Sequence, residues 1–420
     1  MRSPAALALM LVALAARGQG PPAESPVARV AHLPVRSSQE PAVRQALREA
    51  TASHDASVAE WLRIARVGAT SGHEAERAKL INDLFLQAGL ESRILPDGNV
   101  EAIIKGRGTG MPAILSAHLD ELHAPATDAA VRVENGIVMG PGVLDDASGL
   151  ATLTRAAALL MKAGWKPERE VRLVATVNEE VGLLGAKSYL AAHPRLAAFV
   201  TIDGILGGVD YGATGIRWTR FTFNGRGGHT LLADRTPSPS FAAGRAIASI
   251  SSLSDETDAP INVGQMSAGI ATNAIPTEAS FTVDVRSDDP DELSKLSADI
   301  ARVVRAAGDR ESVTLKTESL QDLPAGQLPG HGDSPLVRGA IAILESLDVA
   351  PSAAPRGSAD HNVAILAGIP AMAVGSTLGR HAHSPEETAD VKLLEKGVRQ
   401  AILLTVLLGE GLPERAAVSE

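Results

Sequence analysis

The stretch AILSAHLD at residues 113–120 decides the fold class, because an apolar, strand-like run ends in a histidine and, two residues later, an aspartate. Two later stretches have the same form. LVATVNEE at residues 173–180 ends in paired glutamates, and the apolar run at 199–202 is followed by Asp203. Short apolar runs with polar side chains directly after them indicate buried strands whose carboxyl ends meet at one edge of a sheet.

Helical segments alternate with these strands. Apolar side chains recur at helical spacing over residues 74–89, 149–163, 335–347 and 391–408. Strands and helices that alternate in this way predict an α/β fold, with a mixed, doubly wound sheet that has helices on both faces. Polar residues that follow the strands should then gather at one site.

The segment at residues 213–320 has a different order, strand-helix-strand-strand-helix-strand (βαββαβ). We therefore expect a compact α+β unit inserted into the larger domain. The predicted organisation is a signal peptide, a flexible leader, a first segment of the main domain, the insertion and a second segment of the main domain, at residues 1–20, 21–42, 43–212, 213–320 and 321–420.

The first residues have the form of a secretory signal peptide, because Arg2 precedes a short apolar run, residues 5–16, that ends in small side chains. Cleavage after Ala15 or after Gly20 fits this form. The run is too short for a stable membrane span, which takes about 20 residues. We expect a secreted or periplasmic protein, with a membrane or lipid anchor as the alternative.

The composition excludes several classes of protein. The chain has 420 residues, no cysteine, and 39 basic against 49 acidic side chains, which gives a net charge of −10. Disulfide scaffolds, thiolate metal sites and cysteine nucleophiles are therefore excluded. The negative charge argues against nucleic acid as a partner, because binding phosphates requires clustered lysine and arginine. A bound metal must use histidine, aspartate and glutamate.

Residues of these three types follow strands or open helices at five places. They are His118 with Asp120, the pair Asp145-Asp146, the pair Glu179-Glu180, Asp203, and His383 with His381 as its rival. Asp120 lies two residues after His118, where it can hold the second imidazole nitrogen of a ligating histidine. One of the adjacent aspartates can bridge two cations. The spacing of the last two histidines does not choose between them.

Charge counting supports a two-metal site. If the anionic ligands are Asp145, Glu180 and Asp203 and the two histidines are neutral, two divalent cations leave the cluster at +1, and a bridging hydroxide brings it to zero. Such a site should hold hydroxide near neutral pH, because metals lower the pKa of bound water to about 7. Glu179 could then act as the general base of a hydrolytic reaction.

From about residue 71 to residue 387 the sequence resembles the two-metal exopeptidase and deacylase family that includes carboxypeptidase G, peptidase T, aminoacylase and acetylornithine deacetylase. The resemblance lies in His-Leu-Asp at 118–120, Leu-Asp-Asp at 144–146, Asn-Glu-Glu at 178–180, Ile-Asp-Gly at 202–204 and His-Ser-Pro-Glu-Glu at 383–387. It implies a zinc-exopeptidase-like main domain and two divalent metal ions, zinc in the first place, with cobalt or manganese as alternatives.

The resemblance also implies roles for these residues. Asp145 would bridge the metals and be followed by a cis peptide, and Glu179 would be the base. Glu180 and His383 would bind one metal, and His118 and Asp203 the other, so that His383 is preferred over His381.

The insertion is similar to the lid and dimerisation domain of that family. The similar elements are Gly-Gly-His at 227–229, Asn-Ala-Ile-Pro at 273–276 and Asp-Val-Arg at 284–286. The resemblance implies a homodimer in which His229 reaches the partner's metal site and stabilises the oxyanion, while Asn273 and Arg286 hold the substrate backbone or carboxylate. The alternative for Arg286 is a structural pair with Asp284. Gly357 belongs to a loop similar to the one that lines the family's substrate pocket.

We therefore expect a metal-dependent hydrolase that cleaves an amide bond in di- or tripeptides by a two-metal-bound hydroxide. One alternative is an N-acyl amino acid deacylase on the same scaffold, and a second is a secreted zinc aminopeptidase that works without the lid. A third, a binding protein that has lost catalysis, should lack the base or a ligand, and the sequence has both.

Overall fold

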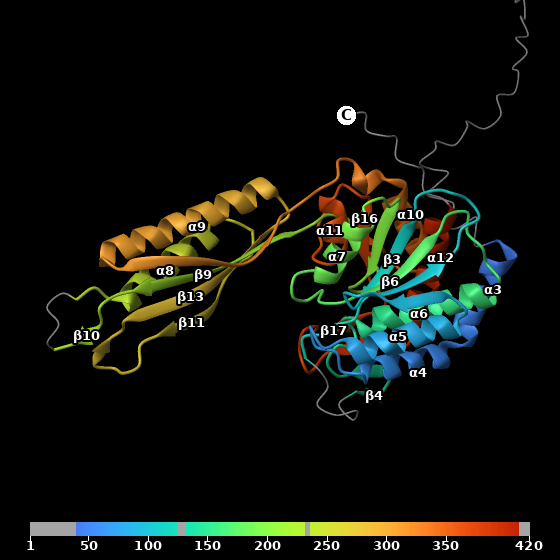
Figure 1. Ribbon diagram of the computed structural model, residues 1–420, viewed down its shortest axis with the longest axis horizontal. Helices are drawn as coiled ribbons and strands as arrows, with labels where there is room; N and C mark the ends of the chain where they lie inside the picture. Colours follow the sequence, from blue (N-terminus) through green and yellow to red (C-terminus); the bar gives the residue numbers. More distant parts are fainter. Residues whose placement is uncertain (1–38, 124–130, 232–235, 411–420) are drawn as a thin grey trace, which may run out of the picture.

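The computed structural model describes residues 39–123, 131–231 and 236–410 of the chain. The predicted signal peptide and residues 21–38 of the predicted leader lie outside these ranges. Figure 1 shows a large α/β part, which we call the main domain, and an elongated unit that projects from it. Among the helices of the described ranges, none combines the length and apolar character that crossing a membrane requires.

The main domain is built on an eight-stranded mixed sheet with the order β1-β2-β6-β3-β7-β16-β8-β15. The four central strands β6, β3, β7 and β16 are parallel, and β1, β2 and β8 add antiparallel pairings. Their bounds are β1 (Glu91–Ile94), β2 (Val100–Ile104), β3 (Ala113–His118), β6 (Val171–Thr176), β7 (Ala198–Ile202), β8 (Gly208–Asp210), β15 (Ser352–Ala354) and β16 (Ala371–Val374).

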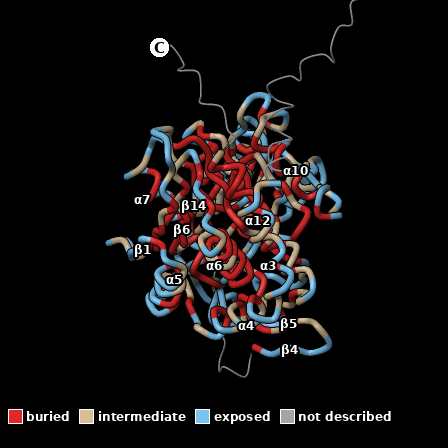
Figure 2. The backbone as a smooth tube through the Cα atoms, turned by 90° about the vertical axis from the view of Figure 1, so that its right-hand side faces the viewer, coloured by how far each residue is buried: buried red, intermediate tan, exposed pale blue. Residues whose placement is uncertain are grey.

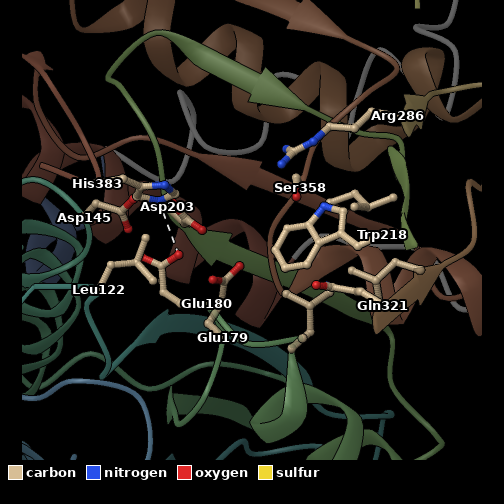
Figure 3. Close-up of a pocket in the computed structure, with 14 residues that line it drawn as sticks. Leu122, Asp145, Glu179, Glu180, Asp203, Trp218, Arg286, Gln321, Ser358 and His383 are labelled. Carbon is tan, nitrogen blue, oxygen red and sulfur yellow. Dashed lines mark ion pairs between the residues drawn. The ribbon is translucent and has the colours of Figure 1, made fainter. Parts of the chain in front are cut away.

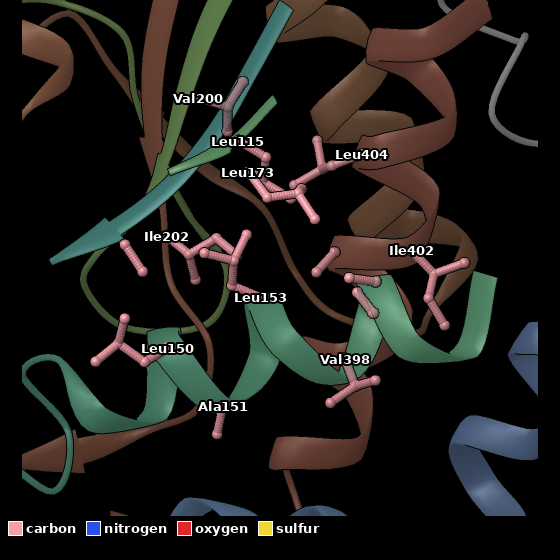
Figure 4. Close-up of a cluster of buried hydrophobic side chains, with 14 of the residues drawn as sticks. Leu115, Leu150, Ala151, Leu153, Leu173, Val200, Ile202, Val398, Ile402 and Leu404 are labelled. Atoms are coloured by element: carbon pink, nitrogen blue, oxygen red, sulfur yellow. The ribbon is translucent and has the colours of Figure 1, made fainter. Parts of the chain in front are cut away.

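Successive side chains of the central strands enter two different cores, because side chains alternate across a strand. On one face Leu115, Leu173 and Val200 pack against α6 (Ala147–Lys162) and α12 (Leu394–Glu410), as Figure 4 shows. On the other face their neighbours in sequence, among them Ile114 and Phe199, pack with residues of α7 (Leu184–Ala192) and α11 (His361–Leu366). The predicted sheet with helices on both faces is therefore confirmed, and Figure 2 shows the buried interior that results.

Elements that the sequence pattern did not predict complete the main domain. Helix α3 (Pro41–Ala52) begins within the segment predicted as a leader, and α4 (His54–Ala65) follows it directly. A second, four-stranded sheet consists of β17 (Gly379–Arg380), β18 (Thr388–Asp390), β5 (Ile137–Met139) and β4 (Arg132–Glu134). The predicted helices are α5 (Ala75–Gln87), α6, α10 (Pro335–Ser346) and α12, and a 3₁₀ turn, η2 (His331–Asp333), precedes α10.

The elongated unit, residues 215–323, is called the lid below. Its antiparallel sheet has the order β11-β13-β9-β14, and two helices cover one face of that sheet. The elements are β9 (Gly215–Asn224), α8 (Pro239–Ser254), β11 (Ile261–Ala268), β13 (Glu278–Ser287), α9 (Pro290–Glu311) and β14 (Thr314–Leu323). A short ribbon of β10 (Gly228–His229) and β12 (Ala274–Ile275) lies at the far end. The lid therefore has the predicted α+β character and a core of its own.

The start of α6 packs so closely on the sheet that it tolerates only glycine. A Cβ atom on Gly149 would overlap the Asp146 carboxylate, which caps α6, and would lie 2.5 Å from the Ile202 carbonyl oxygen. Gly149→Ala should therefore lower the free energy of unfolding by about 2 kcal/mol, because it overpacks this contact and disturbs the cap.

Gly244 in α8 is the matched control, since its Cβ would meet open space. Gly244→Ala should raise the free energy of unfolding by about 0.5–1 kcal/mol through helix propensity. Urea denaturation measures both changes, and equal effects of the two substitutions would contradict the close packing of α6.

Candidate metal centre

Five of the predicted side chains meet at the carboxyl ends of the central strands. His118 ends β3, Glu180 and Asp203 follow β6 and β7, Asp145 precedes α6, and His383 follows β17. Two trios have ligand atoms within 4.8 Å of one another: His118, Asp145 and Asp203, and Asp145, Glu180 and His383. The strands are parallel here, so their ends deliver these residues to one edge of the sheet.

Asp145 belongs to both trios, and its two carboxylate oxygens lie next to different trios. Its Oδ1 lies 2.8 Å from Nε2 of His118, whereas its Oδ2 lies 3.0 Å from Nε2 of His383. His383 Nε2 is also 3.3 Å from Glu180 Oε2, and His118 Nε2 is 3.9 Å from Asp203 Oδ2. A carboxylate with this position can bridge two cations. The peptide bond between Asp145 and Asp146 is cis, as the sequence resemblance implied.

The electrostatics of the cluster fit bound cations. Burial and the charge of Asp145 raise the pKa of Glu180 to about 7, and the same two causes raise the pKa of Asp203 to about 7. The buried Oε1 of Glu180 has no hydrogen-bond partner among the described residues. Carboxylates that repel one another in this way are stabilised in their charged form by nearby positive charge. Three carboxylates with two imidazoles are also a ligand set that zinc and similar divalent metals accept.

Both imidazoles are held by carboxylates. Burial lowers the pKa of His118, but the carboxylates of Asp120 (3.5 Å from Nδ1) and Asp145 (2.8 Å from Nε2) outweigh burial and raise the pKa well above the usual value. The hydrogen bond with Asp145 raises the pKa of His383 to about 9. Because a metal binds neutral histidine, loading the site would release these protons.

Glu179 lies beside the two trios without belonging to either. Its carboxyl is buried and lines the same cavity as Asp145, Glu180 and His383, as Figure 3 shows. Burial raises the pKa of Glu179 well above its usual value, and the charges of Asp203 and Asp360 raise it further. The two adjacent glutamates therefore differ in position, because Glu180 belongs to a trio of candidate metal ligands and Glu179 does not.

The backbone of the Asn178-Glu179-Glu180 segment is held by side chains from other parts of the chain. Asp120 accepts the N–H groups of Glu179 (2.9 Å) and Glu180 (3.2 Å) on its two oxygens. Glu74, at the start of α5, accepts the N–H of Asn178 at 3.0 Å. Asn178 has a left-handed backbone (φ 53°), which asparagine adopts more readily than most residues. Asp120 thus positions the glutamates as well as His118.

Glu387 holds the Asp145 loop from the opposite side. Its buried carboxylate accepts the N–H groups of Leu144 at 2.5 Å and Asp145 at 2.9 Å. Burial raises the pKa of Glu387 to about 7. Glu387 stands in the His-Ser-Pro-Glu-Glu motif, but the sequence did not indicate this role.

A model of peptidase family M20/M25/M40 matches residues 114–404, more than half of the chain. The chain belongs to this family. The predicted resemblance is thereby confirmed, and the protein is a metallo-hydrolase that acts on peptide or amide C–N bonds.

Many solved structures share the fold of this M20 protein, among them a tripeptidase and a dinuclear metal binding peptidase. A tripeptidase from Staphylococcus aureus subsp. aureus Mu50 has a TM-score of 0.74 and 19% identity, with 85% of this chain and 98% of that chain covered. The YXEP protein of Bacillus subtilis, a dinuclear metal binding peptidase, has a TM-score of 0.67 and 19% identity, with 86% and 99% covered. Vacuolar protein sorting-associated protein 70 of Saccharomyces cerevisiae is 28% identical over 136 residues, which are 31% of this chain and 15% of that protein.

The residues predicted to bind substrate do not all lie near the metal centre. Arg286 lines its cavity, and so does Ser358, the neighbour of Gly357. His229 and Asn273 instead lie together at the far end of the lid, where β10 pairs with β12 and the N–H of Thr230 donates to the Asn273 carbonyl. Within one chain the structure therefore does not bring His229 or Asn273 to the metal ligands.

The Glu74 contact allows a test of backbone positioning. Glu74→Ala removes the acceptor of the Asn178 N–H, so we expect kcat to fall by about tenfold, or 1.4 kcal/mol, with metal content unchanged. Glu74→Gln keeps a carbonyl oxygen and should restore most of kcat.

Glu76→Ala is the control, because Glu76 is an exposed residue of the same helix. Steady-state kinetics and metal analysis measure all three variants. A Glu74→Ala enzyme with wild-type kcat would show that the contact is not needed.

Proposed function

We propose that this M20 enzyme hydrolyses small peptides of two or three residues with two divalent metal ions. The observation that carries the proposal is the composition of one cavity of about 200 Å³. The shared carboxylate of Asp145, the separate carboxyl of Glu179 and the guanidinium of Arg286 all line it. A cavity of this size is smaller than the usual drug-sized site, which favours a short substrate.

The ligand sets suggest how the site works. His118 and Asp203 would hold one divalent cation, Glu180 and His383 would hold a second, and Asp145 would contribute to both. Bound cations at this place would polarise the scissile carbonyl and lower the pKa of the attacking water. Glu179 accepts the proton of that water and returns it to the leaving nitrogen. Arg286 pairs with the substrate carboxylate, for which a planar guanidinium suits the geometry.

The lid tip has a role in this proposal only if the enzyme is a homodimer. His229 is exposed and far from the metal ligands of its own chain. In a lid-mediated dimer it reaches the partner's site and stabilises the oxyanion, with Asn273 beside it on the substrate backbone. We also infer a secreted or periplasmic location from the apolar segment at residues 5–16, and the amino-terminal sequence of the mature protein tests it.

Glu179→Gln tests the proton transfer. This variant keeps the size of the side chain and loses its basicity, so hydrolysis of tripeptides and dipeptides should fall by a factor of about 10²–10⁴. Mass spectrometry of the products measures the loss, and N-acetyl amino acids in the same panel test the deacylase alternative.

Metal analysis supplies the control. Glu179→Gln should retain its metals, whereas Glu180→Gln and treatment with a chelator should lose them along with activity. Undiminished turnover by Glu179→Gln would remove Glu179 from the mechanism.

Mixing two inactive variants tests the role of His229. Glu179→Gln and His229→Ala homodimers should each be nearly inactive, and mixed dimers contain one complete site. After subunit exchange we expect about a quarter of the wild-type rate, because half of the randomly formed dimers are mixed and each has one working site of two. A mixture as inactive as its components would place His229 outside the partner's site.

A further inference from the structure

Two rows of side chains on the lid sheet line the cavity opposite the metal ligands. In the first row Ile216 of β9 lies between Arg286 of β13 and Leu323 of β14, its direct cross-strand partners. All three line the cavity. Because residues two apart on a strand share a face, the next row continues the same wall.

The second row has Trp218 of β9 at its centre, opposite Asp284 of β13 and Gln321 of β14. Trp218 and Gln321 line the cavity beside Ile216 and Leu323, and Figure 3 shows the indole ring on the side of the cavity across from Asp145 and Glu180. The register of β14 shifts between Ser319 and Gln321. This irregularity lies beyond the row, so Gln321 and Leu323 keep one register against Trp218 and Ile216 and share a face of the sheet.

Trp218 differs from the other two tryptophans of the chain. Trp61 and Trp165 are buried in the core of the main domain, whereas Trp218 is only partly buried and lines the cavity. Its Nε1–H is buried and has no acceptor among the described residues.

The charges divide the cavity into two ends. The metal ligands make one end acidic. At the other end the wall around the indole is formed by Ile216 and Leu323 of the lid and by Leu183 of the main domain, which packs against these two side chains. The cation of this wall, Arg286, is held through its Nε by Asp284 at 3.1 Å, and Figure 3 shows its guanidinium directed toward the cavity. The indole therefore packs with three apolar side chains, and Gln321 and the Asp284–Arg286 ion pair lie beside it.

We propose that Trp218 and Gln321 form a side-chain subsite that selects substrates with a large apolar or aromatic carboxyl-terminal residue. Trp218 lies one row, about 7 Å, from the row of Arg286, a separation that one amino acid spans between its carboxylate and its side chain. With the carboxylate on Arg286, the side chain lies against the indole. The proposal rests on the proposed function, because it takes the cleaved substrate to be a short peptide.

Dipeptides with different carboxyl-terminal residues test the subsite in the metal-loaded enzyme. We expect wild type to prefer Ala-Phe and Ala-Leu over Ala-Gly by at least about tenfold in kcat/KM. Trp218→Ala should bring this ratio to within about threefold of unity, mainly by raising KM for Ala-Phe while kcat is retained. Trp218→Phe keeps an aromatic ring and should keep most of the preference.

Thr222→Ala is the matched control, because Thr222 lies on the same face of β9 and outside the residues that line the cavity. It should leave the ratio unchanged. A ratio that is the same in Trp218→Ala and in wild type would overturn the subsite, and so would an equal loss on Ala-Phe and Ala-Gly.

A binding measurement separates this proposal from the proposed function. Ala-Leu added to metal-loaded Glu179→Gln should change the tryptophan emission, and the change should disappear when Trp218→Phe is added to that variant. If wild type hydrolyses none of the dipeptides, the proposed function fails, and the same titration still tests the subsite. Equal emission changes with Ala-Leu and Ala-Gly, or an emission change that persists without Trp218, would overturn the proposed subsite.

Discussion

The shared position of Asp145 between two imidazoles is the interaction on which the rest of the site depends. It brings three carboxylates and two histidines together in a partly buried space, where like charges repel more strongly than in water. Burial, together with repulsion from Asp145, raises the pKa values of Glu180 and Asp203. Bound cations or protons must therefore offset the charge of the cluster, and the backbone that carries it must be held by other contacts.

The backbone is held in this way on both sides of Asp145. Glu387 accepts two N–H groups of the Asp145 loop, and Asp120 with Glu74 accepts three successive N–H groups at residues 178–180. These acceptors come from segments far apart in the sequence, so the alignment of the ligands depends on the assembled sheet and on the start of α5. Side chains held by such contacts need little rearrangement on binding, which is the condition for efficient electrostatic catalysis.

The metal ligands could be predicted because each one directly follows a strand or opens a helix, and such positions converge in a parallel sheet. The spacing alone did not choose between His381 and His383, whereas the family resemblance preferred His383. In the structure both have left-handed backbones, and of the two it is His383 that contacts Asp145 and Glu180. The role of Glu74 could not be predicted, because its partner lies about a hundred residues away in the sequence. For Trp218 the sequence predicted only that it lies on an alternating strand. Its place in the cavity wall could not be predicted, because it depends on the register of two neighbouring strands.

The attachment of the lid explains why selectivity belongs at its base. The two segments that join the lid to the main domain are tied together at Ala213 and Gly326, whose N–H and carbonyl groups exchange two hydrogen bonds of 2.9 Å. Any rotation about this pair moves a residue in proportion to its distance from it. Ile216 and Trp218 lie only a few residues beyond Ala213 and would move little, whereas His229 at the tip would travel far (Figure 1). The base of the lid is therefore suited to hold a substrate side chain, and the tip to reach a distant site.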